Sequence, residues 1–305
     1  MDLAFALFPM FMIIVAGYAL VTFGIVPKQM WPAIELLCFR VLIPIVLIDV
    51  LYSADLSLSR IGPFGLAMLG NFIGISALVL VIRFVVSRER LSNSRFTTIF
   101  QTATRWNAFI AFAAADQIGG PASVALIAVG VAVLIPLINV TNIGVLAAFG
   151  PARRSLREAG AAVVKNPLVI SCAVGTVLNL TGLPIPDPLH TGMAAIGAGA
   201  PQIGLLVVGA GIRPGRLFAA TPALWAAVGL RQAVSPGLFL LLASMMGLTP
   251  LETFSGALVL SVPAATNGYI VARQMGGDAE LYADALMWQT AVAVVAIPLL
   301  AVLVL

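Results

Sequence analysis

Ten apolar segments divide the chain, and each is close to the roughly 20 residues that an α-helix needs to cross a bilayer. They cover residues 3–23, 31–51, 62–86, 96–117, 121–149, 166–182, 189–211, 219–247, 252–274 and 279–304. The composition agrees, because 61% of the residues are hydrophobic and 9% are charged, whereas soluble domains carry about 25% charged residues. We therefore expect an all-α integral membrane protein with ten transmembrane helices.

The lysines and arginines of the loops predict how these helices are oriented. Twelve of them fall in loops on one side, and only Arg60 falls on the other. Because such loops remain in the cytoplasm, the count predicts a multi-pass protein of the cell (inner) membrane with both termini outside the cytoplasm. The same placement explains the sequence pI near 9.5, so we expect lipid rather than nucleic acid as the partner. Asp2 precedes the first segment where a signal peptide would be basic, which predicts a membrane span there.

The two halves of the chain repeat one another. Pro9 and Pro167 are 158 positions apart, and Asn107 and Asn267 are 160 positions apart. Further matches join Pro44 to Pro201, residues 117–120 to 274–277, and residues 135–137 to 297–299. Each half holds five segments, so the second enters the membrane from the opposite side. We predict an inverted repeat of residues 1–149 and 166–305, joined by a short cytoplasmic linker at 150–165.

The fourth and ninth segments carry polar residues where lipid alone would favour aliphatic ones. The ninth contains Pro263, Thr266, Asn267 and Gly268, and proline interrupts helical hydrogen bonding. Asn107 is about 16 Å into the fourth segment at 1.5 Å per residue, and Asn267 is about 22 Å into the ninth from the other face. Interrupted helices at matching positions of an inverted repeat are typical of secondary transporters with a midplane binding site. We predict two crossing broken helices there, with Pro263 and Gly268 at the second break.

Three ionisable residues of the apolar segments have two interpretations each. Arg105 is too deep for its side chain to reach the interface easily, so it is either a counter-charge for an anionic substrate or half of a structural ion pair with Asp116 or Glu35. Asp116 and Glu35 are candidates for proton or ion coupling, or else lie at solvated helix ends. For Arg40 and Arg231 we expect structural pairing or helix-end hydrogen bonding.

The chain resembles a short bacterial member of the auxin efflux carrier family, within the bile-acid-symporter-like transporters. The resemblance extends over essentially the whole length and depends most on residues 105–107, 137–140, 166–167, 263–267 and 272–278. It implies substrate contacts by Asn107, Asn139 and Asn267, to which we add Arg105 and Thr266. It also implies small organic anions such as malonate or malate as substrates. Homodimers are known in the family.

This sequence departs from the family pattern in two places. Ala113-Ala114 stands where many relatives have a proline, which predicts a softer kink in the fourth segment than in the ninth. The long central loop of plant members is reduced to residues 151–165, so auxin itself is not the expected substrate.

Other classes of function are less well supported by the sequence. An anion channel, or a uniporter with no coupling ion, remains the alternative to a coupled carrier. Gly276-Gly277-Asp278 is similar to a motif of intramembrane aspartyl proteases, but the aspartate falls in a predicted loop. We expect no enzyme activity, no catalytic residues, no metal site and no cofactor, with a proton or sodium ion as a candidate coupling ion. Cys38 and Cys172 both lie in apolar segments and predict no disulfide framework.

Overall fold

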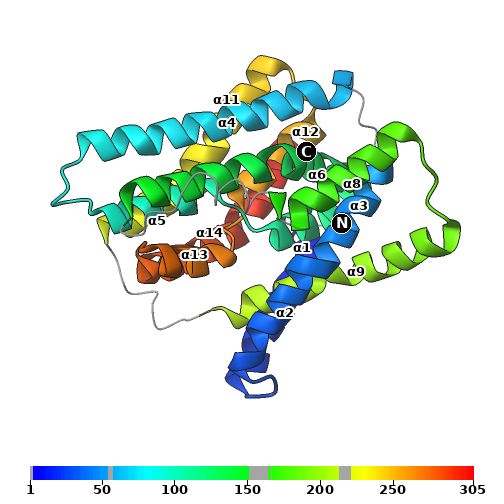
Figure 1. The fold of residues 1–305 in the computed structure, drawn as a ribbon, viewed down its shortest axis with the longest axis horizontal. Helices are drawn as coiled ribbons and strands as arrows, with labels where there is room; N and C mark the ends of the chain where they lie inside the picture. The colour runs from blue at the N-terminus through cyan, green and yellow to red at the C-terminus, as the bar shows by residue number, and fades with distance from the viewer. Residues whose placement is uncertain (1–2, 54–57, 151–163, 166, 213–220) are drawn as a thin grey trace.

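The computed structural model describes residues 3–53, 58–150, 164–165, 167–212 and 221–305 (Figure 1). Within these ranges every secondary-structure element is a helix and there is no strand, which confirms the all-α prediction. In chain order the principal helices are α1 (Leu3–Thr22), α2 (Trp31–Leu37), the π-helix η2 (Cys38–Leu42), α3 (Ile43–Ser53), α4 (Leu58–Val85), α5 (Asn93–Thr104), α6 (Ala108–Phe149), α8 (Pro167–Thr181), α9 (Asp187–Ala210), α10 (Pro222–Gly229), the π-helix η4 (Leu230–Val234), α11 (Ser235–Met246), α12 (Pro250–Ser261), α13 (Asn267–Met275) and α14 (Ala279–Val304).

The ten predicted segments correspond closely to these helices. Five stretches are long and apolar enough to cross a membrane by length and composition: 62–85, 93–149, 187–210, 222–246 and 279–304. The stretch 93–149 contains two predicted segments, and the boundary between them is Gly120, whose φ of 63° and ψ of −163° interrupt the helical geometry of α6. Glycine adopts positive φ without steric cost. That all ten segments cross the membrane remains a prediction.

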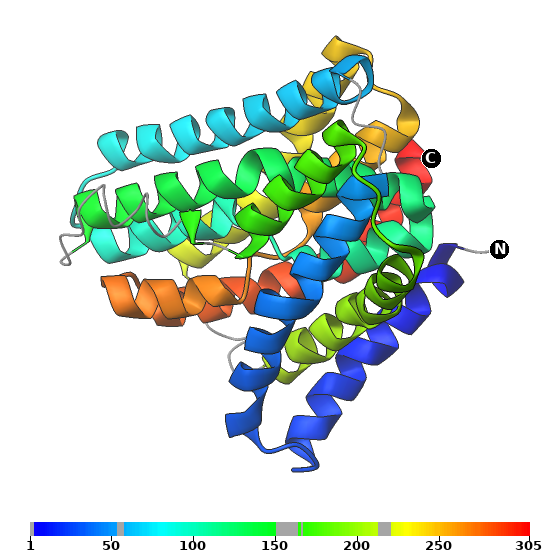
Figure 2. The ribbon, with the colours of Figure 1, turned by 45° about the vertical axis from the view of Figure 1, so that its right-hand side comes forward.

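The helices form two bundles that meet along α6 (Figures 1 and 2). The first bundle consists of α1, α2–η2–α3, α8 and α9, in which α1 packs on α9 and α3 packs on both α8 and α9. The second bundle consists of α4, α5, α6 and α10 to α14, in which α4 packs on α11 and α5 packs on α10 and α14. Helix α6 also contacts α1, α3, α8 and α9. The interface between the bundles is therefore built around α6.

Glycines allow the closest helix contacts of the first bundle. A Cβ added at Gly17 in α1 would lie 2.1 Å from the carbonyl oxygen of Leu206 in α9. A Cβ added at Gly175 in α8 would lie 3.0 Å from the Cα of Ile48 in α3. Both glycines, and both of their partners, are 158 positions apart in the sequence. The pairing of α1 with α9 is therefore repeated, with the halves exchanged, in the pairing of α8 with α3.

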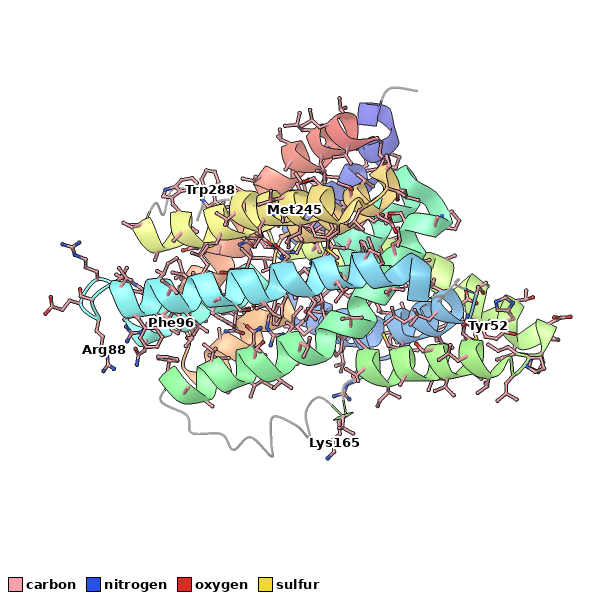
Figure 3. All side chains as sticks on the ribbon, turned by 90° about the horizontal axis from the view of Figure 1, so that it is seen from above. Tyr52, Arg88, Phe96, Lys165, Met245 and Trp288 are labelled. Atoms are coloured by element: carbon pink, nitrogen blue, oxygen red, sulfur yellow. The ribbon has the colours of Figure 1, made fainter. Side chains whose placement is uncertain are left out.

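The two ends of the molecule differ in the loops they carry. Figure 3 shows Arg88 and Phe96 at one end and Tyr52, close to the end of α3, at the opposite end. Arg88 belongs to the arginine-rich loop between α4 and α5, and that this loop lies in the cytoplasm remains a prediction of the charge count. Arg83 lies beside this loop, where its guanidinium is 5.8 Å from the ring centre of Phe96 and donates to the Asn93 side chain.

Candidate functional site

The first helix break separates α5 from α6. Residues 105–107 are non-helical, and Arg105 has an extended backbone with φ −82° and ψ 151°. Asn107 begins the new helix as its N-cap, because its Oδ1 accepts hydrogen bonds from the backbone N–H groups of Phe109 at 3.0 Å and Ile110 at 3.3 Å. Asparagine is among the preferred N-cap residues since it satisfies donors that lack helical partners. One function of Asn107 is thus to restart the helix.

The second break separates α12 from α13 and is five residues long. Pro263 lies in it, and Val262 is extended with φ −72° and ψ 154°, nearly the same as Arg105. The sequence predicted a softer kink at the first break than at the second; the structure interrupts the helix at both, with three non-helical residues at the first and five at the second. The first break contains no proline, since Arg105 is the C-cap of α5 and Asn107 is the N-cap of α6. Asn267 is the first residue of α13, and its side chain lies outside the described part of the structure.

The two breaks contact each other directly. The backbone N–H of Asn107 donates a 2.9 Å hydrogen bond to the carbonyl oxygen of Pro263. On one side of this contact, the start of α5 meets the loop after α13, where Thr98 Oγ1 is 3.1 Å from the Asp278 carbonyl oxygen. On the other side α6 meets α12, where the hydroxyls of Ser123 and Ser255 are 2.7 Å apart. The two interrupted helices therefore cross at their breaks.

Side chains from neighbouring helices satisfy the backbone groups that the breaks expose. Gln289 of α14 accepts from the Ala264 N–H at 2.9 Å and donates to the Thr102 carbonyl at 3.4 Å, so it serves both breaks. The Tyr282 hydroxyl donates to the Ala265 carbonyl at 2.6 Å. Such compensation is what permits irregular backbone at membrane depth. Gln289 and Tyr282 were not predicted from the sequence, although a glutamine within the apolar segment 279–304 is a visible signal.

Arg231 of η4 also satisfies backbone carbonyl groups, in this case at the end of α12 and in the second break. Its Nε donates to the Val262 carbonyl at 2.9 Å and its Nη2 donates to the Val259 carbonyl at 2.6 Å. The side chain is fully buried, and it binds the carbonyl end of α12, where a cation is favoured by the helix dipole. This is the helix-end hydrogen bonding expected for Arg231. Gly268 is required nearby, because a Cβ at this position would lie 2.0 Å from the Tyr282 hydroxyl oxygen.

A cavity of about 310 Å³ opens where the breaks face the first bundle. Its polar lining comes from Glu35, Arg40, Arg105, Asn107, Asn139 and Thr266. Its apolar lining includes Phe39, Ile43, Trp106, Phe109, Ile135, Ile138, Leu168 and Val271. The structure thus brings five predicted site residues, Glu35, Arg105, Asn107, Asn139 and Thr266, to one cavity between the two bundles.

Several hydrogen-bond donors of this lining are buried and have no partner. They are Nε of Arg105, Nδ2 of Asn107 and the indole N–H of Trp106, on side chains that are 6%, 2% and 4% exposed. Buried polar groups are nearly always paired in folded proteins, so these three donors are exceptions that lack an acceptor among the described residues. Among the described residues the Arg105 guanidinium makes one hydrogen bond, from Nη1 to Asn139 Oδ1 at 3.4 Å.

One interpretation of Arg105 paired it with Asp116 or Glu35, and the structure gives both of these carboxylates other surroundings. Glu35 lines the same cavity, but its Oε1 accepts a hydrogen bond from the Thr266 hydroxyl. Asp116 lines a second cavity of about 390 Å³ between α3, α6 and α9, together with Asp49. Among the described residues Arg105 therefore forms no ion pair, and the structural pairing with Asp116 or Glu35 is not observed.

Other polar residues have structural partners. Asn142 donates to Thr104 Oγ1 at 3.0 Å and to the Ile138 carbonyl at 2.7 Å, which distinguishes it from the cavity-lining Asn139. His190 Nε2 is 2.8 Å from Asp49 Oδ1. Asp278 is the N-cap of α14, because its Oδ1 accepts a 2.9 Å hydrogen bond from the Leu281 N–H. This gives Asp278 a structural role, in contrast to the catalytic aspartate of the protease motif that its sequence context resembles. The described residues contain no cluster of three or more metal-ligating side chains.

An all-helical membrane protein with a buried cavity at paired helix breaks has the features of a membrane transporter. The comparison with protein families agrees, because a family model described as membrane transport protein matches residues 151–301. The chain belongs to this family, the auxin efflux carrier family, which is a family of transporters rather than of enzymes. No curated protein matches the chain.

Proposed function

We propose that the protein is a secondary transporter that moves small organic anions across the cell membrane by alternating access. The observation that carries the proposal is the group of unpartnered buried donors, Arg105 Nε and Asn107 Nδ2, on one wall of the cavity at the breaks. A carboxylate has acceptor-only oxygens that match such donors, and hydrogen bonds between charged groups are about twice as strong as neutral ones. Malonate- and malate-like carboxylates, which the family resemblance suggests, are the first candidates.

The formal charge of the cavity also favours an anion. Arg40 and Arg105 contribute two positive charges to its lining and Glu35 contributes one negative charge. The sum is one positive charge in a space with mostly apolar walls. Positive charge inside a membrane protein is costly unless a partner offsets it, and a bound carboxylate would offset it. The proposed substrate site comprises Arg105, Asn107, Asn139, Thr266 and Asn267.

Alternating access requires a site that can open to either face of the membrane, and an inverted repeat supplies two related halves that can do this. Two observations support such a repeat. The glycine contacts Gly17 to Leu206 and Gly175 to Ile48 have the same 158-residue offset with the halves exchanged. Arg105 and Val262 begin the two breaks with the same extended backbone. We propose that ten helices cross the membrane as two inverted repeats, with both chain termini outside the cytoplasm.

An anion channel, or a uniporter with no coupling ion, is the alternative. Selective channels commonly have rings of charged side chains or carbonyl filters along a pore, whereas Glu35, Arg40 and Arg105 line one cavity at the helix breaks. A carrier driven by a proton or sodium gradient accumulates its substrate above equilibrium, and a channel does not. The dependence of uptake on an imposed ion gradient therefore separates the two functions.

The test is uptake of radiolabelled malonate or malate by proteoliposomes that contain the full chain, with and without proton and sodium gradients. Wild-type protein is expected to give saturable uptake, and Asn107→Ala to abolish it. Asn142→Ala is the matched control, because Asn142 lies one helical turn beyond the cavity and bonds to Thr104. Equal uptake by wild-type and Asn107→Ala vesicles would remove the site from the proposal. Lack of uptake of any carboxylate by wild-type vesicles would reject anion transport.

A further inference from the structure

Arg40 is a second cation of the cavity at the helix breaks, and it belongs to the other bundle. It lies in the π-helix η2 of the first bundle, whereas Arg105 lies in the first break of the second bundle. Both side chains line the cavity. π-Helical turns inside α-helices are rare and frequently occur at functional sites. The backbone conformation around Arg40 therefore singles out the same position as its charge.

The Arg40 guanidinium has no partner among the described residues. From the sequence we expected structural pairing or helix-end hydrogen bonding, which Arg231 shows, but within the described ranges Arg40 forms neither an ion pair nor a side-chain hydrogen bond. Glu35, the one acidic side chain of the described cavity lining, binds Thr266 instead. At 1.5 Å per residue Arg40 is about 14 Å beyond Trp31 in its predicted span. Ionisable side chains at such depth usually pair or line a substrate path.

We propose that Arg40 binds the second carboxylate of a dicarboxylate whose first carboxylate lies at Arg105, and that Arg40 thereby selects dicarboxylates over monocarboxylates. The inference rests on the proposed function and narrows its substrate class. A guanidinium can donate two parallel hydrogen bonds to a carboxylate, so each end of a dicarboxylate meets a donor group of matching geometry. A monocarboxylate leaves the Arg40 guanidinium without an acceptor.

This arrangement gives the carboxylates of the protein and of the substrate separate partners. Glu35 keeps the Thr266 hydroxyl as its donor, and the carbon chain of the substrate contacts apolar lining residues such as Phe39 and Ile138. With a dicarboxylate bound, the two guanidinium groups, Glu35 and the two substrate carboxylates carry one negative charge in total. The coupling proton or sodium ion of the proposed carrier would offset that charge.

The expected effect follows from the strength of one such contact. A hydrogen bond to a charged group changes Kd by about one to two powers of ten. Arg40 is exposed, so water and ions weaken its attraction for the second carboxylate. We therefore take the lower limit, a change in Kd of about tenfold. Arg40→Gln removes the charge and most of the donors, whereas Arg40→Lys keeps the charge on a group with different geometry.

The experiment compares malonate with propionate and succinate with butyrate, because the acids of each pair have the same number of carbons and differ by one carboxylate. Their Kd values are measured at neutral pH by titration calorimetry on the purified full chain in detergent. Wild-type protein is expected to bind the diacid more tightly than its monoacid in at least one pair. In Arg40→Gln the Kd of that diacid relative to its monoacid is expected to rise about tenfold, and in Arg40→Lys it is expected to rise less.

Arg88→Gln is the matched control, since it removes the same charge in the loop between α4 and α5, at one end of the molecule (Figure 3). Its ratio is expected to equal that of wild type, and an equal rise in this control would overturn the inference, because net charge would then be responsible. Arg40→Met is a second neutral variant in case the first fails to fold.

Three further outcomes separate the inference from the function on which it rests. A ratio that stays at the wild-type value in whichever neutral variant folds would overturn the inference and leave anion transport intact. Equal binding of diacid and monoacid by the wild type in both pairs would do the same. If none of the four acids binds the wild-type protein, the proposed function itself fails and the inference with it.

Discussion

Gln289 offers the most direct test of how the crossing breaks are stabilised. Its side chain is fully buried, accepts from the Ala264 N–H at 2.9 Å, and donates to the carbonyl oxygens of Ala227 at 3.0 Å and Thr102 at 3.4 Å. Gln289→Leu has a similar volume and removes all three bonds at once. The perturbation is therefore confined to hydrogen bonding at and beside the two breaks.

The cost follows from the groups that lose their partners. A buried donor without a partner costs about 1–3 kcal/mol, and with two weakened carbonyls we expect a total of about 2–4 kcal/mol for Gln289→Leu. For a chain of this size that corresponds to a fall in the midpoint of thermal unfolding of about 3–6 °C. The Kd for the transported carboxylate should rise as well, because the breaks set the position of Asn107.

The assay is thermal unfolding of the full chain in detergent, followed by tryptophan fluorescence. Gln29→Leu is the matched control, because Gln29 is exposed in the short helix η1 (Lys28–Met30), and its midpoint should equal that of wild type. A midpoint for Gln289→Leu as high as that of the control would refute the role of this side chain in holding the breaks.

Three further substitutions test the site and the packing around it. Gly268→Ala should lower the unfolding midpoint and weaken carboxylate binding, because the new Cβ overlaps the Tyr282 hydroxyl 2.0 Å away; Tyr282→Phe in the same chain should recover part of the midpoint if the overlap is the cause. Gly17→Val should reduce the yield of folded protein, since its side chain meets the α9 backbone, whereas Gly199→Ala, with no atom within 4 Å of its Cβ, should not. Asn267→Ala should abolish carboxylate binding without lowering protein yield; normal uptake by this variant in proteoliposomes would remove Asn267 from the site.

The helices and their interruptions could be predicted because their causes are local in the sequence. Apolar length defines a helix that fits a bilayer, and Pro263 removes a backbone donor where α12 ends. The boundary at Gly120 was visible as a Gly-Gly pair, and the structure gives this residue the positive φ that glycine permits. The first break was underestimated, because an asparagine N-cap leaves no proline in the sequence to mark it.

Contacts between distant segments could not be predicted in the same way. Glu35 and Thr266 are 231 residues apart, and only the packing of α2 against the second break brings them together. Arg105 and Asp116 are close in sequence, but they line different cavities because α6 carries Asp116 away from the break. Which polar side chains pair in a membrane protein depends on which helix faces pack together. The sequence alone does not specify this packing.

The central claim is that the crossing breaks form one anion site with Arg105 as its cation. Calorimetric titration of malonate into the wild-type chain and into Arg105→Gln tests it most directly, because glutamine keeps an amide donor near the position of Nε and lacks the charge and the rest of the guanidinium. We predict saturable binding by the wild type and a Kd raised at least about tenfold in the variant, as expected for the loss of a buried charge-assisted hydrogen bond. Equal Kd values for the two proteins, both folded, would contradict the claim and place the anion elsewhere in the molecule.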